Sequence, residues 1–261
     1  MSLLSWIILF CLIGGVLSVM AAATFLLLSE SIRKRLLPHM VSYAIGALLG
    51  AAFLALLPHA LAHPGVSDLH DVSLTVLIGI LAFFLLEKMV LWRHCHAHDC
   101  EVHGEEDKNH AHGSARGTMI MIGDGMHNLV DGVLIGAAFL TDIHVGIVTS
   151  IAVATHEIPQ ELGDFSILLH SGYSRGKALI MNIAASLTTV IGGVAAYYSL
   201  QGVEHLIPYV LAVAAASFIY IAVADLIPSL HHRTEARVTA QQMALIAAGV
   251  ITIYLAHSTL H

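Results

Sequence analysis

The sequence predicts an all-α, polytopic membrane protein with eight transmembrane helices, in a single membrane domain that covers residues 1–261. Three observations lead to this prediction. First, 57% of the residues are hydrophobic and only 11% are charged, whereas a soluble domain carries about 25% charged residues. Second, the apolar residues fall into runs of about 20, and a helix of that length crosses about 30 Å of hydrocarbon. Third, Lys and Arg occur only beside alternate runs.

The predicted helices are the apolar runs between polar breaks. They cover about 3–29, 39–63, 72–93, 116–140, 143–170, 177–200, 204–230 and 239–260. The first run is too long for a cleavable signal peptide and lacks its basic start. It leads into the basic residues 33–35, which is typical of a stop-transfer anchor.

The basic residues test the number of helices, because Lys and Arg accumulate in cytoplasmic loops. All 11 lie in the first, third, fifth and seventh loops or on the helix turn that enters them: Arg33, Lys34, Arg35, Lys88, Arg93, Lys108, Arg116, Arg175, Lys177, Arg233 and Arg237. Six or seven spans would break this alternation. The sequence therefore predicts eight spans, with both termini on the extracytoplasmic side.

The fourth and fifth helices carry five carboxylates and two histidines near membrane depth, where ionisable residues are rare and costly. No Lys or Arg occurs between Arg116 and Arg175, so this charge has no basic partner in its own helix pair. A cation is needed to neutralise it, either protons or a metal ion; mutual pairing of buried polar groups is the alternative. The residues are Asp124, His127, Asp131, His156, Glu157, Glu161 and Asp164.

Helical spacing places these residues on two polar faces. Asp124, His127 and Asp131 lie at i, i+3 and i+7 and so share one face of the fourth helix. Imidazole nitrogens and carboxylate oxygens together suit Zn²⁺, Fe²⁺ and Mn²⁺ better than Na⁺ or K⁺. The stripe on the fifth helix has steps of three and four and consists of His156, Glu157, Gln160, Glu161 and Asp164.

Pro159 lies in the middle of the fifth helix. A proline has no N–H group, and its ring pushes on the carbonyl four residues back, here that of Thr155. We expect broken helix geometry at this point, and transporters commonly place substrate sites at such interruptions. Four glycines are expected to let the fourth and fifth helices approach each other closely: Gly123, Gly125, Gly132 and Gly163.

The segment 94–115, between the third and fourth helices, is predicted to be a histidine-rich cytoplasmic loop. Its composition is too polar to fold alone and is typical of metal binding. A solvated linker with incidental histidines is the alternative. We expect loose, weak metal binding by His94, Cys95, His96, His98, Cys100, His103, His110 and His112.

The segments HNLVDG (127–132) and HEIPQELGDF (156–165) resemble the signature helices of the ZIP (Zrt/Irt-like protein) family of metal transporters. The resemblance covers nearly the whole chain and is strongest to the branch whose fifth helix reads HEIPHELGDF. It implies a 3+2+3 inverted-repeat bundle, elevator-type movement of a transport bundle against a scaffold, and metal transport toward the cytoplasm. It also implies a metal site between the fourth and fifth helices, formed by His127, Asn128, Asp131, His156, Glu157 and Gln160.

The remaining carboxylates of the two polar faces, Asp124, Glu161 and Asp164, form a second tier of candidate ligands. Two positions depart from the family pattern. Gln160 stands where this branch often has His, and Thr188 in the sixth helix stands where some relatives have a carboxylate ligand. The site therefore has fewer ligands for a second metal ion.

Zinc is the predicted cargo, with iron, manganese and cadmium as further candidates, and no resident cofactor is expected. The predicted partners are these ions, the lipid bilayer and a second copy of the chain in a homodimer, with no nucleic acid. The lack of a large outer domain favours a bacterial inner (cytoplasmic) membrane over an organellar membrane.

Two other functions remain open on the sequence. An intramembrane zinc hydrolase would use an H-E-x-x-H motif on an intact helix, but Gln160 replaces the second histidine, so no enzyme is predicted. The other is a membrane-embedded metal sensor that uses the histidine-rich loop.

Overall fold

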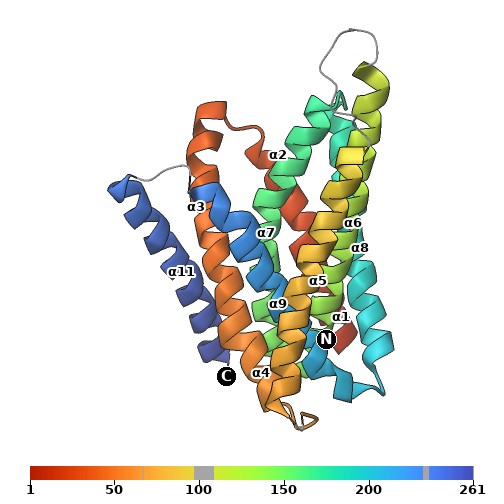
Figure 1. Cartoon of the computed structure of the whole chain (residues 1–261), viewed down its shortest axis with the longest axis vertical. Coiled ribbons are helices and arrows are strands. Elements are labelled where there is room, and N and C mark those ends of the chain that lie inside the picture. The colour runs from red at the N-terminus through yellow and green to blue at the C-terminus, as the bar shows by residue number, and fades with distance from the viewer. Residues whose placement is uncertain (67, 97–108, 232–234, 261) are drawn as a thin grey trace.

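The computed structural model describes residues 1–66, 68–96, 109–231 and 235–260, and within these ranges it contains helices and no strands. The described residues form eight continuous helical rods that pack as one bundle (Figure 1). Both termini lie at one end of the bundle, and α5 ends and α6 begins at the other (Figure 1).

Three of the rods contain a π-helical turn. The first is α1 (Leu3–Leu12), η1 (Ile13–Leu17) and α2 (Ser18–Phe25), and the second is α3 (Glu30–Ala51), η2 (Ala52–Leu56) and α4 (Leu57–Ala62). The seventh comprises the 3₁₀ turn η3 (Glu204–Leu206), α9 (Ile207–Tyr220), the π-helical turn η4 (Ile221–Leu226) and α10 (Ile227–Leu230). The others are α5 (Leu69–His96), α6 (Asn109–Thr141), α7 (Ile143–His170), α8 (Arg175–Leu200) and α11 (Ala236–Leu260).

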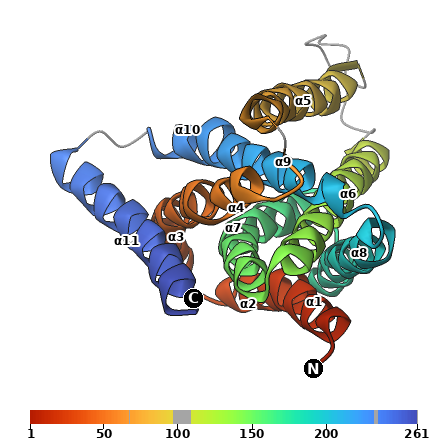
Figure 2. The same ribbon diagram turned by 90° about the horizontal axis from the view of Figure 1, so that it is seen from below.

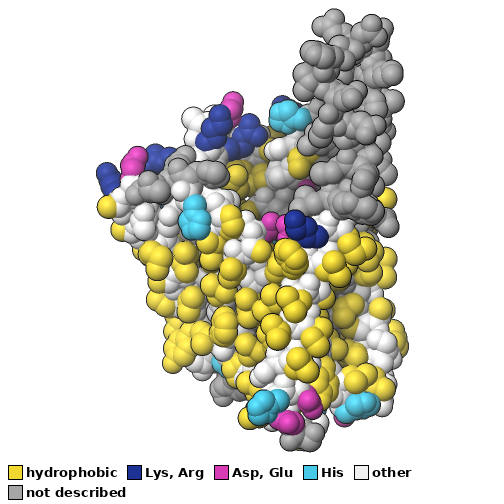
Figure 3. Space-filling view, in the orientation of Figure 1, with side chains coloured by type: hydrophobic (Ala, Val, Ile, Leu, Met, Phe, Trp, Pro, Cys, Tyr) yellow, Lys and Arg dark blue, Asp and Glu magenta, His cyan; other side chains and the backbone are white. Residues whose placement is uncertain are grey.

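Six of these rods are long and apolar enough to cross a membrane, and the two that miss this criterion are α6 and α7, whose apolar runs are interrupted by ionisable residues. Figure 3 shows a broad hydrophobic band between two polar ends. Lys and Arg gather at one end, and His, Asp and Glu at the other. The chain is therefore an integral membrane protein, and the count of eight membrane spans stays a prediction.

Helices α6 and α7 lie in the middle of the bundle, and α5 and α11 lie at its edge (Figure 2). Helix α6 packs on α7, α8 and α1, and α7 also packs on α2 and α3. At the periphery, α11 packs mainly on α3, and α5 on α9. The central position of α6 and α7 surrounds their ionisable residues with other helices.

The closest helix contacts are made by glycine. A Cβ atom added to Gly132 would lie 1.9 Å from the carbonyl oxygen of Thr189, and one added to Gly46 would lie 2.0 Å from that of Ile246. Small residues allow such backbone contact between membrane helices. The prediction that glycines bring the fourth helix close to the fifth is wrong. Gly125 and Gly132 face α8, and a Cβ on Gly123 or Gly163 would have no neighbour within 4 Å.

The π-helical turns of the second and seventh rods each precede a proline. Pro58 and Pro228 have no N–H group, and the carbonyls four residues before them, Leu54 and Ala224, lie inside η2 and η4. A π-helical turn accommodates the displaced carbonyl without ending the rod. Both rods thus use the same device, and the inverted repeat stays a prediction. The break predicted at Pro159 does not occur, because α7 runs continuously from residue 143 to 170.

The helix ends differ from the prediction by a few residues at most positions. The second helix starts at Glu30, so Arg33, Lys34 and Arg35 lie on its first turns and not in a loop. Glu30 and Lys34 form an exposed i,i+4 ion pair with 2.6 Å between Oε1 and Nζ. The fourth helix starts at Asn109, seven residues earlier than predicted. Polar residues at these ends extend the helices past the hydrocarbon, where hydropathy no longer marks them.

Candidate metal-binding site

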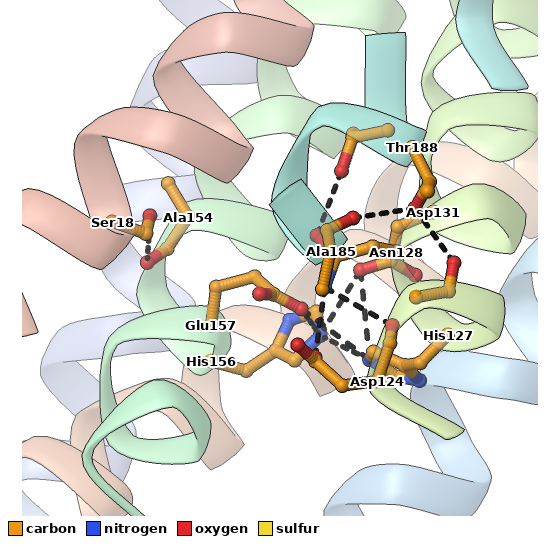
Figure 4. Close-up of polar contacts among 12 residues, drawn as sticks. Ser18, Asp124, His127, Asn128, Asp131, Ala154, His156, Glu157, Ala185 and Thr188 are labelled. Carbon is orange, nitrogen blue, oxygen red and sulfur yellow. Dashed lines mark hydrogen bonds and ion pairs between the residues drawn. The ribbon is translucent and has the colours of Figure 1, made fainter. Parts of the chain in front are cut away.

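Four side chains from α6 and α7 meet in the centre of the bundle. His127 and Asp131 come from α6, and His156 and Glu157 come from α7 (Figure 4). Each offers one ligand atom, and these four atoms all lie within 4.8 Å of one another. We call these residues the four-residue cluster.

The distances within the four-residue cluster suit a tetrahedral zinc ion. Nε2 of His127 lies 3.3 Å from Nε2 of His156 and 3.4 Å from Oε1 of Glu157, and Nε2 of His156 lies 3.2 Å from Oδ2 of Asp131. The two remaining nitrogen–oxygen distances are 3.7 and 3.8 Å. Metal–ligand bonds of about 2.0–2.2 Å in a tetrahedron place neighbouring ligand atoms about 3.3–3.6 Å apart.

The imidazole of His156 is oriented for ligation. Its Nδ1 lies 3.1 Å from the carbonyl oxygen of Ala152, which can only accept a hydrogen bond. Nδ1 therefore carries the proton, and the lone pair of Nε2 points into the four-residue cluster.

The charge of the four-residue cluster is buried and not neutralised by a basic residue. Asp131, His156 and Glu157 are at most 1% exposed, whereas the His127 side chain is 26% exposed. No carboxylate oxygen of Asp131 or Glu157 has a hydrogen-bond partner. Among the described residues, the only acid paired with Lys or Arg is Glu30. Two buried carboxylates without such a partner are costly, and a divalent cation between them removes that cost.

A family model matches nearly the whole chain. Residues 2–257 match the family model described as "ZIP Zinc transporter". The chain belongs to the ZIP zinc transporter family.

Curated relatives of this ZIP-family chain are named as zinc transporters. ZIP13 of Pongo abelii is 31% identical over 231 residues, which are 84% of this chain and 66% of the relative. Zipt-7.2 of Caenorhabditis elegans is 31% identical over 299 residues, which cover 93% of this chain and 64% of the relative. Human ZIP4 is 45% identical over 114 residues, which cover 43% of this chain and 17% of the relative. The chain thus spans two thirds or less of the length of these three relatives.

Two of the six residues that the ZIP resemblance implies lie beside the four-residue cluster and not in it. Asn128 is fully buried, and its Nδ2 donates to Oδ1 and to the carbonyl oxygen of Asp124, at 2.9 and 3.2 Å. Its Oδ1 accepts a hydrogen bond of 2.7 Å from the Thr189 hydroxyl. Gln160 is half-buried, one turn beyond His156 on α7. Their role as ligands stays a prediction.

Thr188 of this ZIP-family chain contacts backbone groups and lies outside the four-residue cluster. Its hydroxyl lies 2.6 Å from the carbonyl oxygens of both Gly125 and Ala185, so it caps backbone groups of α6 and α8 (Figure 4). The second-tier residues lie on the same side of the four-residue cluster. Asp124 and Glu161 are buried and Asp164 is half-buried.

Three residues near the ZIP site were not identified as site residues from the sequence. Thr189 of α8 orients Asn128. Phe218 of α9 lies with its ring centroid 6.1 Å from that of His156. Asp225 in η4 is close enough to interact electrostatically with both cluster histidines. A threonine, a phenylalanine and a lone acid in apolar helices carry no pattern that would identify them.

The predicted ligands of the histidine-rich loop cannot be placed in this site. Residues 97–108, which include His98, Cys100 and His103, lie outside the described residues. Of the segment 94–115 only backbone is described, as the end of α5 at His96 and the start of α6 at Asn109.

Proposed function

We propose that this chain carries divalent transition metal ions, zinc foremost, across the membrane toward the cytoplasm through the four-residue cluster. The observation that carries the proposal is the convergence of two imidazoles and two carboxylates from α6 and α7 at membrane depth without a basic partner. The names of the relatives support zinc as the cargo.

The ligand set balances the charge of a divalent cation. Asp131 and Glu157 contribute two negative charges, and neutral His127 and His156 contribute nitrogen lone pairs. Iron, manganese and cadmium fit the same mixture of donors, so we propose them as secondary cargo. His127 is the only member that is more than 1% exposed, which makes it the point where an ion enters or leaves.

We further propose that the ion crosses by elevator-type movement between two groups of helices. The first rod, α6, α7 and α8 would move together, since α6 and α8 touch through their backbones at Gly132. The second and seventh rods, α5 and α11 would form the scaffold, held by the equally close contact of α3 with α11 at Gly46. Contacts of α7 with α3 and of α6 with α9 would then form the sliding interface.

The membrane arrangement is part of the proposal. Eight spans with extracytoplasmic termini place the basic end of the bundle in the cytoplasm, following the distribution of Lys and Arg. We propose a bacterial cytoplasmic membrane and a homodimer, as expected from the sequence.

Uptake into proteoliposomes tests the transport function. The purified protein should carry zinc or cadmium, and His127→Ala and His156→Ala should each abolish uptake, because each removes a ligand. His170→Ala, an exposed histidine at the end of the same α7, is the matched control and should transport normally. No uptake of zinc, cadmium, iron or manganese by the unmodified protein would refute the proposal.

A further inference from the structure

Two buried carboxylates outside the four-residue cluster have no counter-charge. Asp124 is 5% exposed and Glu161 is 0% exposed. Oδ2 of Asp124 and both carboxylate oxygens of Glu161 have no hydrogen-bond partner. Neither residue pairs with Lys or Arg among the described residues. Such oxygens are costly to bury unless a ligand satisfies them.

Both residues are displaced from the four-residue cluster in the same direction. Asp124 lies one turn before His127 on α6, and Glu161 lies one turn after Glu157 on α7. Because α6 and α7 are consecutive and run in opposite directions, both lie toward the end of the bundle where α5 ends and α6 begins (Figure 1). Glu161 is also close enough to Asp124 and Asp164 for electrostatic repulsion.

The carboxylate of Asp124 is held in place by a chain of hydrogen bonds. The Thr189 hydroxyl donates to Oδ1 of Asn128 at 2.7 Å, and Nδ2 of Asn128 donates to Oδ1 of Asp124 at 2.9 Å. Both Asn128 and Thr189 are fully buried. These hydrogen bonds fix Oδ1 of Asp124 and leave Oδ2 available, as is typical of a metal ligand that is positioned by its neighbours.

A third unpartnered polar side chain lies at a similar depth. Asn182 on α8 is 0% exposed, and neither its amide nitrogen nor its amide oxygen has a hydrogen-bond partner. A Cβ on Gly125 of α6 would come within 4.0 Å of Ala185, three residues after Asn182. Asn182 thus lies about one turn from the level of Asp124 along the bundle.

We propose a second divalent-cation site, here called the inner site, in which Asp124 and Glu161 bind the ion after it leaves the four-residue cluster. This inference rests on the proposed transport function. Asn128 and Thr189 are positioning residues for Asp124, Asn182 supplies a neutral oxygen, and half-buried Asp164 lies at the outlet.

The chemistry of the inner site favours release. Its donors are oxygens only, which hold zinc less strongly than imidazole does. These oxygens do not converge as closely as the four-residue cluster, the only described group of three or more His, Cys, Asp or Glu within 4.8 Å. The bound ion therefore keeps part of its water shell. Weak binding after strong binding lets the ion move on toward the cytoplasm.

Cadmium-113 NMR of the whole protein tests the inner site directly, because oxygen-only ligation gives a resonance well separated from those of imidazole and thiolate sites. We expect such a resonance in the unmodified protein. Glu161→Gln and Asp124→Asn should each remove it and keep the resonance of the four-residue cluster. Glu30→Gln, an exposed acid, should leave both unchanged. If the oxygen-only resonance is absent, or survives Glu161→Gln, the inner site does not exist.

Transport kinetics separate the inner site from the proposed function. Glu161→Gln should lower maximal zinc uptake by about tenfold or more at an unchanged half-saturating concentration, since the four-residue cluster remains intact. Normal uptake by Glu161→Gln, together with loss in His127→Ala, would overturn the inner site alone. Normal uptake by His127→Ala would overturn the proposed function itself.

A conservative pair at Thr189 tests the positioning role. Thr189→Val keeps the shape but removes the hydroxyl that holds Asn128, so the oxygen-only cadmium resonance should shift or broaden. Thr189→Ser retains the hydroxyl and should give the oxygen-only resonance of the unmodified protein. The same resonance in Thr189→Val as in the unmodified protein would show that Asp124 is not positioned through this chain.

Discussion

Helix α6 contacts its two neighbours in opposite ways. Toward α8 its backbone comes so close at Gly132 that a single methyl group would overlap the Thr189 carbonyl oxygen. Toward α7 it presents His127 and Asp131, which meet His156 and Glu157 without a basic partner. The first face fixes where the helix lies, and the second leaves a charged gap for an ion. Stability and metal binding should therefore respond to different substitutions on the same helix.

The largest expected effect is on the α8 face. Gly132→Ala places a Cβ atom 1.9 Å from the Thr189 carbonyl oxygen, so α6 and α8 must separate, at a cost of about 1–3 kcal/mol or more. Thermal unfolding of the purified protein should show a large loss of stability. Gly123→Ala, with nothing within 4 Å, is the matched control on the same helix. Equal stability of the two variants would contradict the close contact.

On the α7 face, Asp131→Asn should leave the fold intact and remove metal binding. The substitution keeps the shape but removes one of the two negative charges that balance the cation. Removing even an indirect partner of a metal ligand costs about 10–100-fold in affinity, so the loss of a ligand should cost at least about 100-fold. Equilibrium zinc binding measures this, with Glu30→Gln as control. An affinity within a few-fold of the unmodified protein would exclude Asp131 as a ligand.

Glu157→Gln should separate stability from binding most clearly. The metal-free protein should become more stable, because a fully buried carboxylate without hydrogen-bond partners is replaced by a neutral amide. Zinc at about 100 times its dissociation constant stabilises a protein by about 2.7 kcal/mol, and this gain should be lost in the variant. Melting curves with and without zinc measure both effects. A less stable metal-free variant would contradict the uncompensated charge.

The smallest and most gradual effect is that of pH. Protons compete with metal for the imidazoles and carboxylates, so the apparent zinc affinity should fall as the pH is lowered from about 8 to about 5. Uptake at several zinc concentrations between about pH 5 and pH 8 measures this fall. A constant half-saturating concentration across that range would contradict direct ligation by His127 and His156.

Much of the fold could be predicted because a bilayer requires apolar helices long enough to cross it, and because basic residues accumulate on its cytoplasmic side. Apolar runs and the alternation of basic residues indicated the helix from 143 to 170 with the same ends as α7, and the others to within several residues. The π-helical turns could not be predicted. Pro58, Pro159 and Pro228 look alike in the sequence, yet only the first and third follow a π-helical turn. Packing around each helix decides how a displaced carbonyl is accommodated.

The candidate site was predictable where helical spacing alone determines which side chains share a face. His127 and Asp131 are separated by four residues and must share a face, and His156 and Glu157 lie at the matching depth of the next helix. Asn128 shows the limit. Its neighbours in the sequence make it a candidate ligand, and only the structure shows that the hydroxyl of Thr189 on α8, 61 residues away, donates a hydrogen bond to its amide oxygen.

The sequence by itself determined that this chain is a helical membrane protein of the ZIP type and that its unpaired charge lies on two consecutive helices. These properties follow from composition, hydropathy and spacing, which are local along the chain. Only the tertiary structure decided which side chains converge, that α6 rests on α8 through Gly132, and that Oδ2 of Asp124 and both carboxylate oxygens of Glu161 remain buried without hydrogen-bond partners. Such features depend on the rotation and depth of each helix, which are set by contacts between residues far apart in the chain.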